Sequence, residues 1–430
     1  MISRRTSLRV MPAVWFALPI ILLAGAYSMA LYPSWGYGLA ATALGTGALP
    51  FVAGFTAATA AWEGARLRRT VWWAPSVRPR FVIAAWAVLP SVLVGVAATL
   101  AGIAVLLVRS EAVVPDPVVI GVAVLVLVAW AAVGFAAGIL LPVPVAVPIG
   151  ILLPFVWLAF VPAVYPLWLR HLTGMFRDCC GLAEDLAAAA VVASALVNVG
   201  FIVAASVLIA GHRSMRRIGA SVVALAVPLA AGAALVSGMT YAPVVPRDPS
   251  LLACRERDGL TLCLWPEHVA QADEIAGIAS GVRTRWLAAG IGVPAVFTEA
   301  DRSIVPSGSL AIGVVTSTAS DDVIADLAAG LIPPFPVCID PRTGDEMGTT
   351  GGVATTWLQA WYAAAGGMSQ GRLTEEYGSE WDLPGTTLDP LPTVDALLKV
   401  SPEARRAWAA HAAALVATCE EVEVDLTVRP

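Results

Sequence analysis

The stretch FVIAAWAVLPSVLVGVAATLAGIAVLLV, residues 81–108, decides what kind of protein this sequence encodes. It continues for 28 residues without a charged side chain. A helix that crosses the hydrocarbon core of a bilayer needs about 20 predominantly apolar residues, and this stretch exceeds that length. The stretch therefore predicts a transmembrane helix.

Six further apolar stretches accompany this one in the first half of the chain. The seven predicted spans lie at about 11–32, 38–62, 81–108, 118–141, 145–165, 186–211 and 219–241. Only the segment LPVPVAVP divides the fourth span from the fifth, and we separate the two there because proline ends one helix and can begin the next. Residues 1–242 are therefore predicted to form a polytopic α-helical membrane bundle of about seven spans.

Composition and charge agree with a membrane protein. Of the 430 residues 58% are hydrophobic and 13% charged, with a mean hydropathy of +0.78, whereas about 25% of the residues in a soluble domain are charged. Residues 1–244 carry a net charge of +8 and residues 245–430 a net charge of −13. An ordinary soluble protein is excluded, and the two halves are expected to occupy different environments.

The arginines near the span ends predict the orientation. Eleven lie before the first span and in the loops after the second and sixth spans, against three in the opposite loops. Because cytoplasmic loops are enriched in Lys and Arg, the N terminus is predicted to be cytoplasmic. The first span is longer than the apolar region of a typical signal peptide and is expected to remain as an anchor. Seven spans then place everything after Tyr241 outside the plasma membrane.

Cysteine positions give a separate check on this topology. All six cysteines fall in segments that it places outside, where disulfides persist: Cys179, Cys180, Cys254, Cys263, Cys338 and Cys419. The cysteine usage therefore agrees with an extracellular C-terminal domain.

The predicted spans contain few groups that could move ions or protons. Glu63 lies at the cytoplasmic end of the second span and Asn198 is the main polar group of the sixth, which argues against an ion-coupled carrier. Gly134 and Gly138 form a GxxxG match that predicts close helix packing, within one bundle or between two. A Walker A loop ends in Lys followed by Ser or Thr, and the only lysine, Lys399, is followed by valine. If ATP drives this protein, another chain must bind it.

The segment WEGARLRRTVWWAPSVRPR, residues 62–80, is the main cytoplasmic element of the predicted topology. In one interpretation its arginines and tryptophans anchor the chain in the lipid headgroup region. In the other it is a short coupling helix along the membrane that docks on a separate ATPase, with the candidate residues Glu63, Arg66, Arg68, Arg69, Trp72 and Trp73.

This layout, with AWEGARLRR (residues 61–69) as the local match, resembles the ABC-2-type permease group. Residues 1–240 are most similar to the small permease-like membrane proteins of actinobacterial exporter operons. The resemblance implies a coupling helix in this loop and a dimeric channel, here a homo- or heterodimer, that works with two ATPase subunits. The chain departs from the group in one respect: six spans are usual, and here a seventh carries an external domain.

After a linker at 243–250, residues 251–430 are predicted to form an extracytoplasmic α/β domain, because strand and helix patterns alternate. The domain opens with a hairpin at 251–265 around the two-residue turn Asp258-Gly259. Further strands are predicted at 293–299, 309–315, 335–340 and 421–428, and helices at 266–289, 321–330, 353–365, 393–399 and 402–420. Ser401 is a predicted N-cap of the last helix.

The hairpin register predicts a disulfide. Counting outward from the turn, Cys254 faces Cys263 at the fourth pair, a non-hydrogen-bonded pair whose Cα atoms lie about 4.5 Å apart, within the disulfide range. Cys338 with Cys419 is a second candidate pair, between a strand and a helix end. Adjacent cysteines rarely bond each other, so Cys179 and Cys180 are expected to pair elsewhere, remain free or link two chains.

Two enzyme-like patterns are interpreted as chance matches. GMSQG, residues 367–371, has the GxSxG form, and Asp382 or Asp389 followed by His411 completes a triad order. The serine, however, follows a predicted helix instead of a strand. His268 has no partners at zinc-ligand spacing, and it and Glu267 are expected to be cap and surface groups. No catalytic, metal or cofactor site is predicted, and neither an enzyme activity nor a nucleic-acid partner is expected.

Two hypotheses of function remain open. In the first, the chain is a permease-like subunit of an ABC-type export complex, with the bilayer and a separate ATPase as partners. In the second, it is a membrane-anchored binding or sensor protein whose external domain does the work and whose spans are scaffold.

Overall fold

The computed structural model describes residues 11–31, 36–69, 79–112, 114–177, 179–210, 214–239, 241–313, 318–334, 336, 351–378, 381–383 and 386–418. The chain divides into two compact units, Met1–Val245 and Pro246–Pro430.

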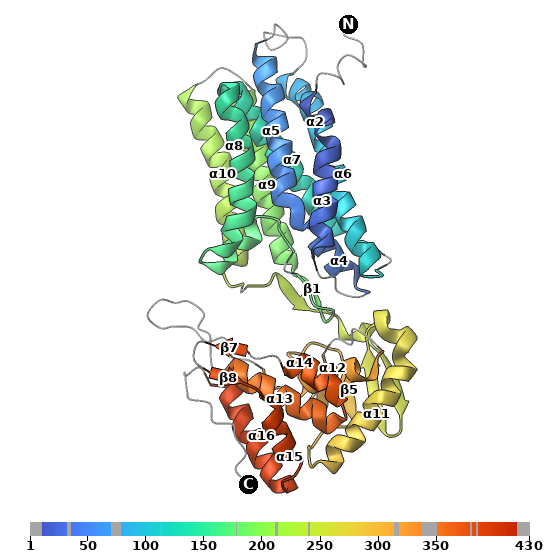
Figure 1. The fold of residues 1–430 in the computed structure, drawn as a ribbon. Helices are drawn as coiled ribbons and strands as arrows, with labels where there is room; N and C mark the ends of the chain where they lie inside the picture. The colour runs from blue at the N-terminus through green and yellow to red at the C-terminus, as the bar shows by residue number, and fades with distance from the viewer. Residues whose placement is uncertain are drawn as a thin grey trace. The chain divides into compact units, whose positions relative to one another are not determined.

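The N-terminal unit is a bundle of apolar helices (Figure 1). Its helices are α2 (Pro12–Trp15), α3 (Ala17–Met29), α4 (Gly38–Gly45), α5 (Leu49–Arg68), α6 (Arg80–Arg109), α7 (Pro117–Leu140), α8 (Val143–Phe155), α9 (Ala188–Ile209) and α10 (Met215–Val236). Shorter elements complete it: the 3₁₀ turns Thr46–Ala48, Val161–Ala163 and Leu167–Leu172, the π turn Val156–Phe160, and strand β1 (Glu184–Leu186), which pairs with β2 (Val244–Pro246).

Six helical segments of the described residues are long and apolar enough to cross a membrane. They are Gly38–Arg68, Arg80–Arg109, Pro117–Leu140, Val143–Ala163, Ala188–Ile209 and Met215–Val236. Each corresponds to one of the predicted spans, with ends that differ by a few residues. The N-terminal half of the chain is therefore that of a membrane protein.

The first predicted span, 11–32, differs from a single long helix. It consists of α2 and the 13-residue α3, which meet at Phe16, where φ is −95° and ψ is 3°. Pro19 explains the interruption, since proline has no N–H for the carbonyl four residues earlier, at Trp15, and its ring clashes with that carbonyl. Pro19 then lies in the first turn of α3, where a missing N–H is tolerated.

Helix α5 is largely enclosed by its neighbours, and glycines permit the closest contacts. A Cβ atom at Gly134 or Gly138 of α7 would overlap the carbonyl oxygen of Ala57 or Ala61, and one at Gly64 of α5 would overlap that of Phe135. The GxxxG match therefore packs α7 against α5 within the bundle, with the two helices parallel.

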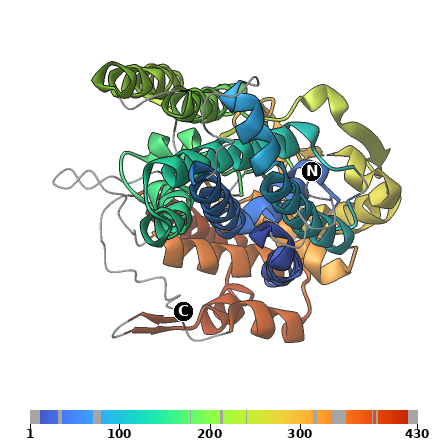
Figure 2. The same cartoon turned by 90° about the horizontal axis from the view of Figure 1, so that it is seen from above.

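Helix α10 is much less enclosed. Only 6% of its apolar window is buried, compared with 72% for Gly38–Arg68. It packs along α9, where Pro228 lies against Gly200 and the Ser221 hydroxyl donates to the Ala204 carbonyl at 3.0 Å. Figure 2 shows the bundle from above. Most of the α10 surface is thus left for lipid.

The C-terminal unit contains a four-stranded mixed sheet of order β3-β4-β5-β6, with β3 antiparallel to β4 and the other neighbours parallel. The strands are β3 (Ala253–Arg257), β4 (Leu260–Leu264), β5 (Val296–Thr298) and β6 (Ser309–Ala311), and β7 (Trp381–Leu383) and β8 (Thr386–Leu388) form a separate hairpin. The helices are α11 (Ala272–Ala288), α12 (Ser320–Gly330), α13 (Gly351–Gly366), α14 (Gln370–Tyr377), α15 (Leu391–Leu397) and α16 (Pro402–Val416), with 3₁₀ turns at Pro249–Leu251 and Pro266–Gln271.

The opening hairpin has the predicted register. Asp258 and Gly259 both have positive φ, 48° and 72°, as a type I′ turn requires, and Cys254 lies opposite Cys263. The two strands differ in environment, because β3 is exposed at the sheet edge whereas β4 is largely buried between β3 and β5. Ser401 accepts a hydrogen bond from the Ala404 N–H at 3.3 Å and caps α16, as predicted.

Other elements of this unit differ from the prediction. The strands at 293–299 and 309–315 shorten to three residues each, and the helix expected from Pro266 begins as a 3₁₀ turn. Helix α14 was not predicted and occupies part of the expected loop after α13. The predicted strand at 421–428 and most of the one at 335–340 lie outside the described residues.

Candidate functional site

The basic end of α5 holds most of the predicted docking residues. Glu63 is buried, and its Oε2 lies 2.8 Å from Nη2 of Arg66, one helical turn further on. Its other oxygen, Oε1, has no hydrogen-bond partner among the described residues. Arg68 is the last residue of the helix and Arg69 its C-cap, so the arginine-rich segment that was predicted to be cytoplasmic begins as a continuation of this helix. Trp72 and Trp73 lie outside the described residues.

This end of α5 is packed into the bundle. Leu67 packs against a cluster of buried residues that includes Ala84 of α6, Phe135 of α7 and Ile209 of α9. The basic end of α5 is therefore anchored in the apolar interior of the bundle.

The opposite end of the bundle brings together the loops predicted to be external. Nη1 of Arg109 donates to the carbonyls of Ser28, Met29 and Leu31 at 3.2, 2.9 and 2.7 Å, and this cation stabilises the C-terminal end of α3. At the same end the Tyr37 hydroxyl lies 2.8 Å from the Asp185 carboxylate. The bundle thus sorts its loops into the same two groups that the arginine count separates.

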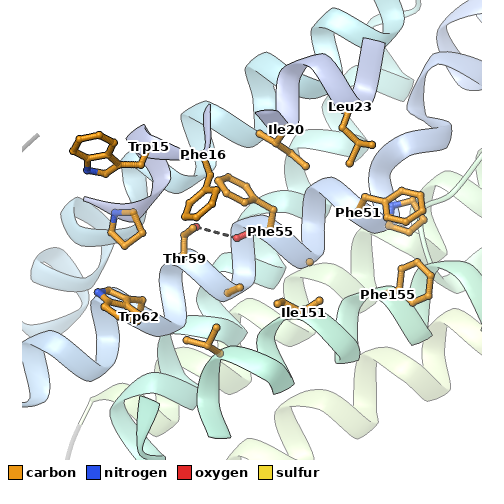
Figure 3. Close-up of a pocket in the computed structure, with 15 residues that line it drawn as sticks. Trp15, Phe16, Ile20, Leu23, Phe51, Phe55, Thr59, Trp62, Ile151 and Phe155 are labelled. Carbon is orange, nitrogen blue, oxygen red and sulfur yellow. Dashed lines mark hydrogen bonds between the residues drawn. The ribbon is translucent and has the colours of Figure 1, made fainter. Parts of the chain in front are cut away.

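An apolar groove of about 810 Å³ lies between the N-terminal helices, α5 and α8 (Figure 3). The lining residues are Pro12, Trp15, Phe16, Ile20, Leu23, Pro50, Phe51, Gly54, Phe55, Ala58, Thr59, Trp62, Val147, Ile151 and Phe155. Apart from the two indole N–H groups, Thr59 supplies the only polar side chain among them, and its hydroxyl donates to the Phe55 carbonyl at 3.0 Å. The groove therefore suits an apolar ligand.

The groove has two distinct ends. Figure 3 shows Trp15 and Trp62 at one end, and Leu23, Phe51 and Phe155 at the other. The Phe51 and Phe155 rings are 5.4 Å apart. Sequence reasoning missed this groove, although the aromatic residues of α5 lie at helical spacing along one face and Pro19 marks the break that opens it.

The C-terminal unit contains a buried polar network at the end of β5. Nδ1 of His268 lies 2.7 Å from Oε1 of Glu299, whose Oε2 accepts the Trp265 backbone N–H at 2.8 Å. The Trp265 indole donates to the Glu299 carbonyl at 2.9 Å. Arg247 forms a two-bond ion pair with Glu267, at 3.1 and 3.0 Å, and covers the Trp265 ring.

The expectation that His268 is a surface group is therefore wrong. The 3₁₀ turn Pro266–Gln271 directs its ring toward Glu299, and His268 is only 8% exposed. The described residues contain no group of three or more His, Cys, Asp or Glu side chains that could hold a metal ion. The hydrogen bonds of this network join the segment after β4 to the end of β5. The network therefore has a structural role.

Ser369 of the GxSxG match is a helix cap. Gly367 ends α13 in the left-handed conformation, with φ of +90°, and Ser369 then caps α14. The serine hydroxyl donates to Oδ2 of Asp321 at 2.5 Å, and its backbone N–H donates to Oδ1 at 3.1 Å. The serine thus follows a helix, as expected, and its hydroxyl is committed to joining α12 and α14.

The other residues of the chance triad match are Asp382 or Asp389 and His411. The side chain of Asp382 lies outside the described residues. Asp389 accepts the Leu391 N–H at 2.9 Å just before α15, and His411 lies on α16. Beside Ser369, Arg372 pairs with Glu375, Glu376 and Asp322 at 3.1, 3.1 and 3.2 Å. Hydrogen bonding to Glu375 and the charge of Glu376 raise the pKa of the Arg372 guanidinium.

The structure contains two disulfides among the described cysteines. One joins Cys254 to Cys263 across the hairpin, with Cα atoms 3.9 Å apart. The other joins Cys179 to Cys180 across a cis peptide bond. The expectation that these adjacent cysteines pair elsewhere, remain free or link two chains is wrong, because they are joined to each other. Cys338 and Cys419 lie outside the described residues.

Comparisons with known proteins concern the C-terminal unit. A model of the domain family DUF7224, a domain of unknown function, matches residues 262–419. The match begins within β4 and covers most of this unit. No curated protein and no solved structure matches the chain.

Proposed function

We propose that this chain is the membrane subunit of an ABC-type export complex and that a separate ATPase chain energises it. The ATPase docks at the basic end of α5, and the chain works as a homo- or heterodimer. The observation that carries this proposal is the placement of α5. Helix α5 leads into the arginine-rich segment, packs against α6, α7 and α8, and lines the apolar groove.

The proposal includes an orientation of this bundle in the membrane. Helices α2 and α3 together cover residues 12–29, which corresponds to about 27 Å at about 1.5 Å per residue, close to the hydrocarbon thickness of about 30 Å. We take them as one interrupted crossing, so that the chain crosses seven times. The arginine-rich end of the bundle is then cytoplasmic, and the disulfide-containing C-terminal unit is outside, where disulfides persist.

A charge reversal tests the docking surface. Arg68→Glu should reduce the amount of ATPase that copurifies with the tagged full-length chain from native membranes, because a cationic contact becomes repulsive. Arg216→Glu is the control, since Arg216 also lies at the proposed cytoplasmic end of a span, α10; its side chain is exposed, whereas that of Arg68 is half-buried. Equal ATPase recovery in wild type and both variants would count against docking at α5.

The second candidate function is that of a membrane-anchored binding or sensor protein. It is favoured by the independent architecture of the C-terminal unit, which has its own sheet, its own core around Trp286, Phe297 and Trp361, and its own disulfide. If the C-terminal unit of the full-length chain binds a ligand or partner, and no ATPase copurifies with the chain, this second function is favoured over the first.

A further inference from the structure

The length of the apolar groove matches one leaflet of a bilayer. Along α5 its lining extends from Pro50 to Trp62. The 12 residue steps between them correspond to about 18 Å at about 1.5 Å per residue, somewhat more than half of the hydrocarbon thickness of about 30 Å. A ligand that fills the groove therefore has the length of a single acyl chain in one leaflet.

Tryptophans mark the end of the groove nearest the membrane surface. Trp15 of α2 and Trp62 of α5 line that end, and their side chains are 70% and 45% exposed. Tryptophan is enriched where the hydrocarbon meets the headgroups. The deep end, at Leu23, Phe51 and Phe155, then lies near the middle of the bilayer (Figure 3).

Two arginines continue the groove face of α5 beyond Trp62. At 3.6 residues per turn, Phe51, Phe55, Trp62, Arg66 and Arg69 fall within about 60° of the helix circumference. Arg68 lies about 100° away from Arg69, off this face. The Arg66 side chain is 39% exposed, and its ion pair with Glu63 uses only part of a guanidinium that carries five N–H donors. Positive charge thus follows the tryptophans where a headgroup would lie.

We propose that this groove binds an anionic phospholipid, with an acyl chain between α3, α5 and α8 and its phosphate held by Arg66 and Arg69. Each part of such a lipid meets a matching part of the site. The acyl chain occupies the apolar groove, the boundary between hydrocarbon and headgroup lies at Trp15 and Trp62, and the phosphate lies at the two arginines. The lipid belongs to the cytoplasmic leaflet, and this assignment is the only part of the proposal that rests on the proposed orientation.

Native mass spectrometry of the purified full-length chain tests this site, with phosphatidylglycerol or phosphatidylcholine of identical acyl chains added to detergent micelles. We expect a larger phosphatidylglycerol adduct than phosphatidylcholine adduct. Arg69→Gln should reduce the phosphatidylglycerol adduct about fivefold, the factor that corresponds to about 1 kcal/mol per cation near an anionic headgroup. Arg68→Gln, which changes an arginine off the groove face, should leave the adduct unchanged. Arg69 is the better test position because removing Arg66 also leaves Glu63 without its ion pair.

A second pair of variants tests the apolar slot. Ile151 lines the groove, whereas its neighbour Leu152 does not, and both side chains are exposed, at 48% and 59%. Ile151→Trp should fill the groove and abolish both adducts, and Leu152→Trp should retain them.

Three results would each overturn the assignment: equal binding of the two lipids, equal effects of the two arginine variants, or unchanged lipid binding by Ile151→Trp. So would an apolar molecule other than a phospholipid that copurifies in the groove and excludes phosphatidylglycerol. No ATPase is present in this assay, so its failure would leave the export proposal standing, and the reverse also holds.

Discussion

At the scale of single residues, the Glu299 carboxylate shows how the C-terminal unit is held together. Its side chain is fully enclosed, and both of its oxygens are bonded, to His268 and to the Trp265 backbone N–H. A buried carboxylate is tolerated only when it is paired and hydrogen-bonded. The residues that meet it come from the segment after β4, so this one side chain fixes that segment to the end of β5.

Replacing Glu299 should therefore destabilise the C-terminal unit. Glu299→Ala leaves the Trp265 N–H and the His268 ring without their acceptor, and loss of one partner from a buried pair costs about 3–5 kcal/mol. Glu375→Ala, which removes an exposed ion pair with Arg372, should cost less, at most about 1 kcal/mol. Pulse proteolysis of the full-length chain in urea measures both. A Glu299→Ala midpoint equal to that of Glu375→Ala would contradict the structural role of this network.

Comparing the predicted and observed contacts of single residues shows which of them the sequence could predict. The opposition of Cys254 and Cys263 was predictable because a two-residue turn fixes the register of a hairpin. The burial of His268 was not, because its partner Glu299 is 31 positions away and only the assembled sheet brings them together. The bond between Cys179 and Cys180 was not predicted, because adjacent cysteines rarely bond each other.

At the scale of elements, the sequence predicted the membrane-spanning helices better than it predicted how those helices are interrupted and packed. Six spans were predictable because length and apolarity alone define them. The break at Phe16 was overlooked because apolarity continues through it, although Pro19 carried the signal. The groove depends on which helices become neighbours, and hydropathy does not encode that. Helix α14 was missed because its cap, Ser369, lies inside a motif that suggested a loop.

The contact between α5 and α7 gives a prediction at this scale. Gly138→Leu places a side chain where the Ala61 carbonyl lies, so α5 and α7 must separate, and overpacking of this kind costs about 1–3 kcal/mol or more. Gly121→Leu lies on the same helix with open space around it and should behave like wild type. Size-exclusion chromatography in detergent should show a loss of monodisperse protein for Gly138→Leu alone. Similar profiles for the two variants would argue against this packing.

At the scale of the whole molecule, the chain consists of a cationic membrane unit and an acidic C-terminal unit. The net charges are +8 for residues 1–244 and −13 for residues 245–430. This difference agrees with the proposed orientation, in which the cations of the membrane unit face the cytoplasm and the acidic unit lies outside. The matched domain family covers only the C-terminal unit, so the proposed role of the membrane unit rests on α5 and its basic end.

Site-specific photo-crosslinking in intact native membranes tests this role most directly. A photoreactive phenylalanine analogue at position 68 should yield an adduct with a protein that carries a Walker A motif, because the ATPase is proposed to dock there. The same analogue at position 216 of α10 should give no such adduct. An ATPase adduct at 68 and not at 216 is the result that the account predicts. Adducts at 68 that consist only of lipid or of other proteins would contradict the claim that a separate ATPase energises this chain.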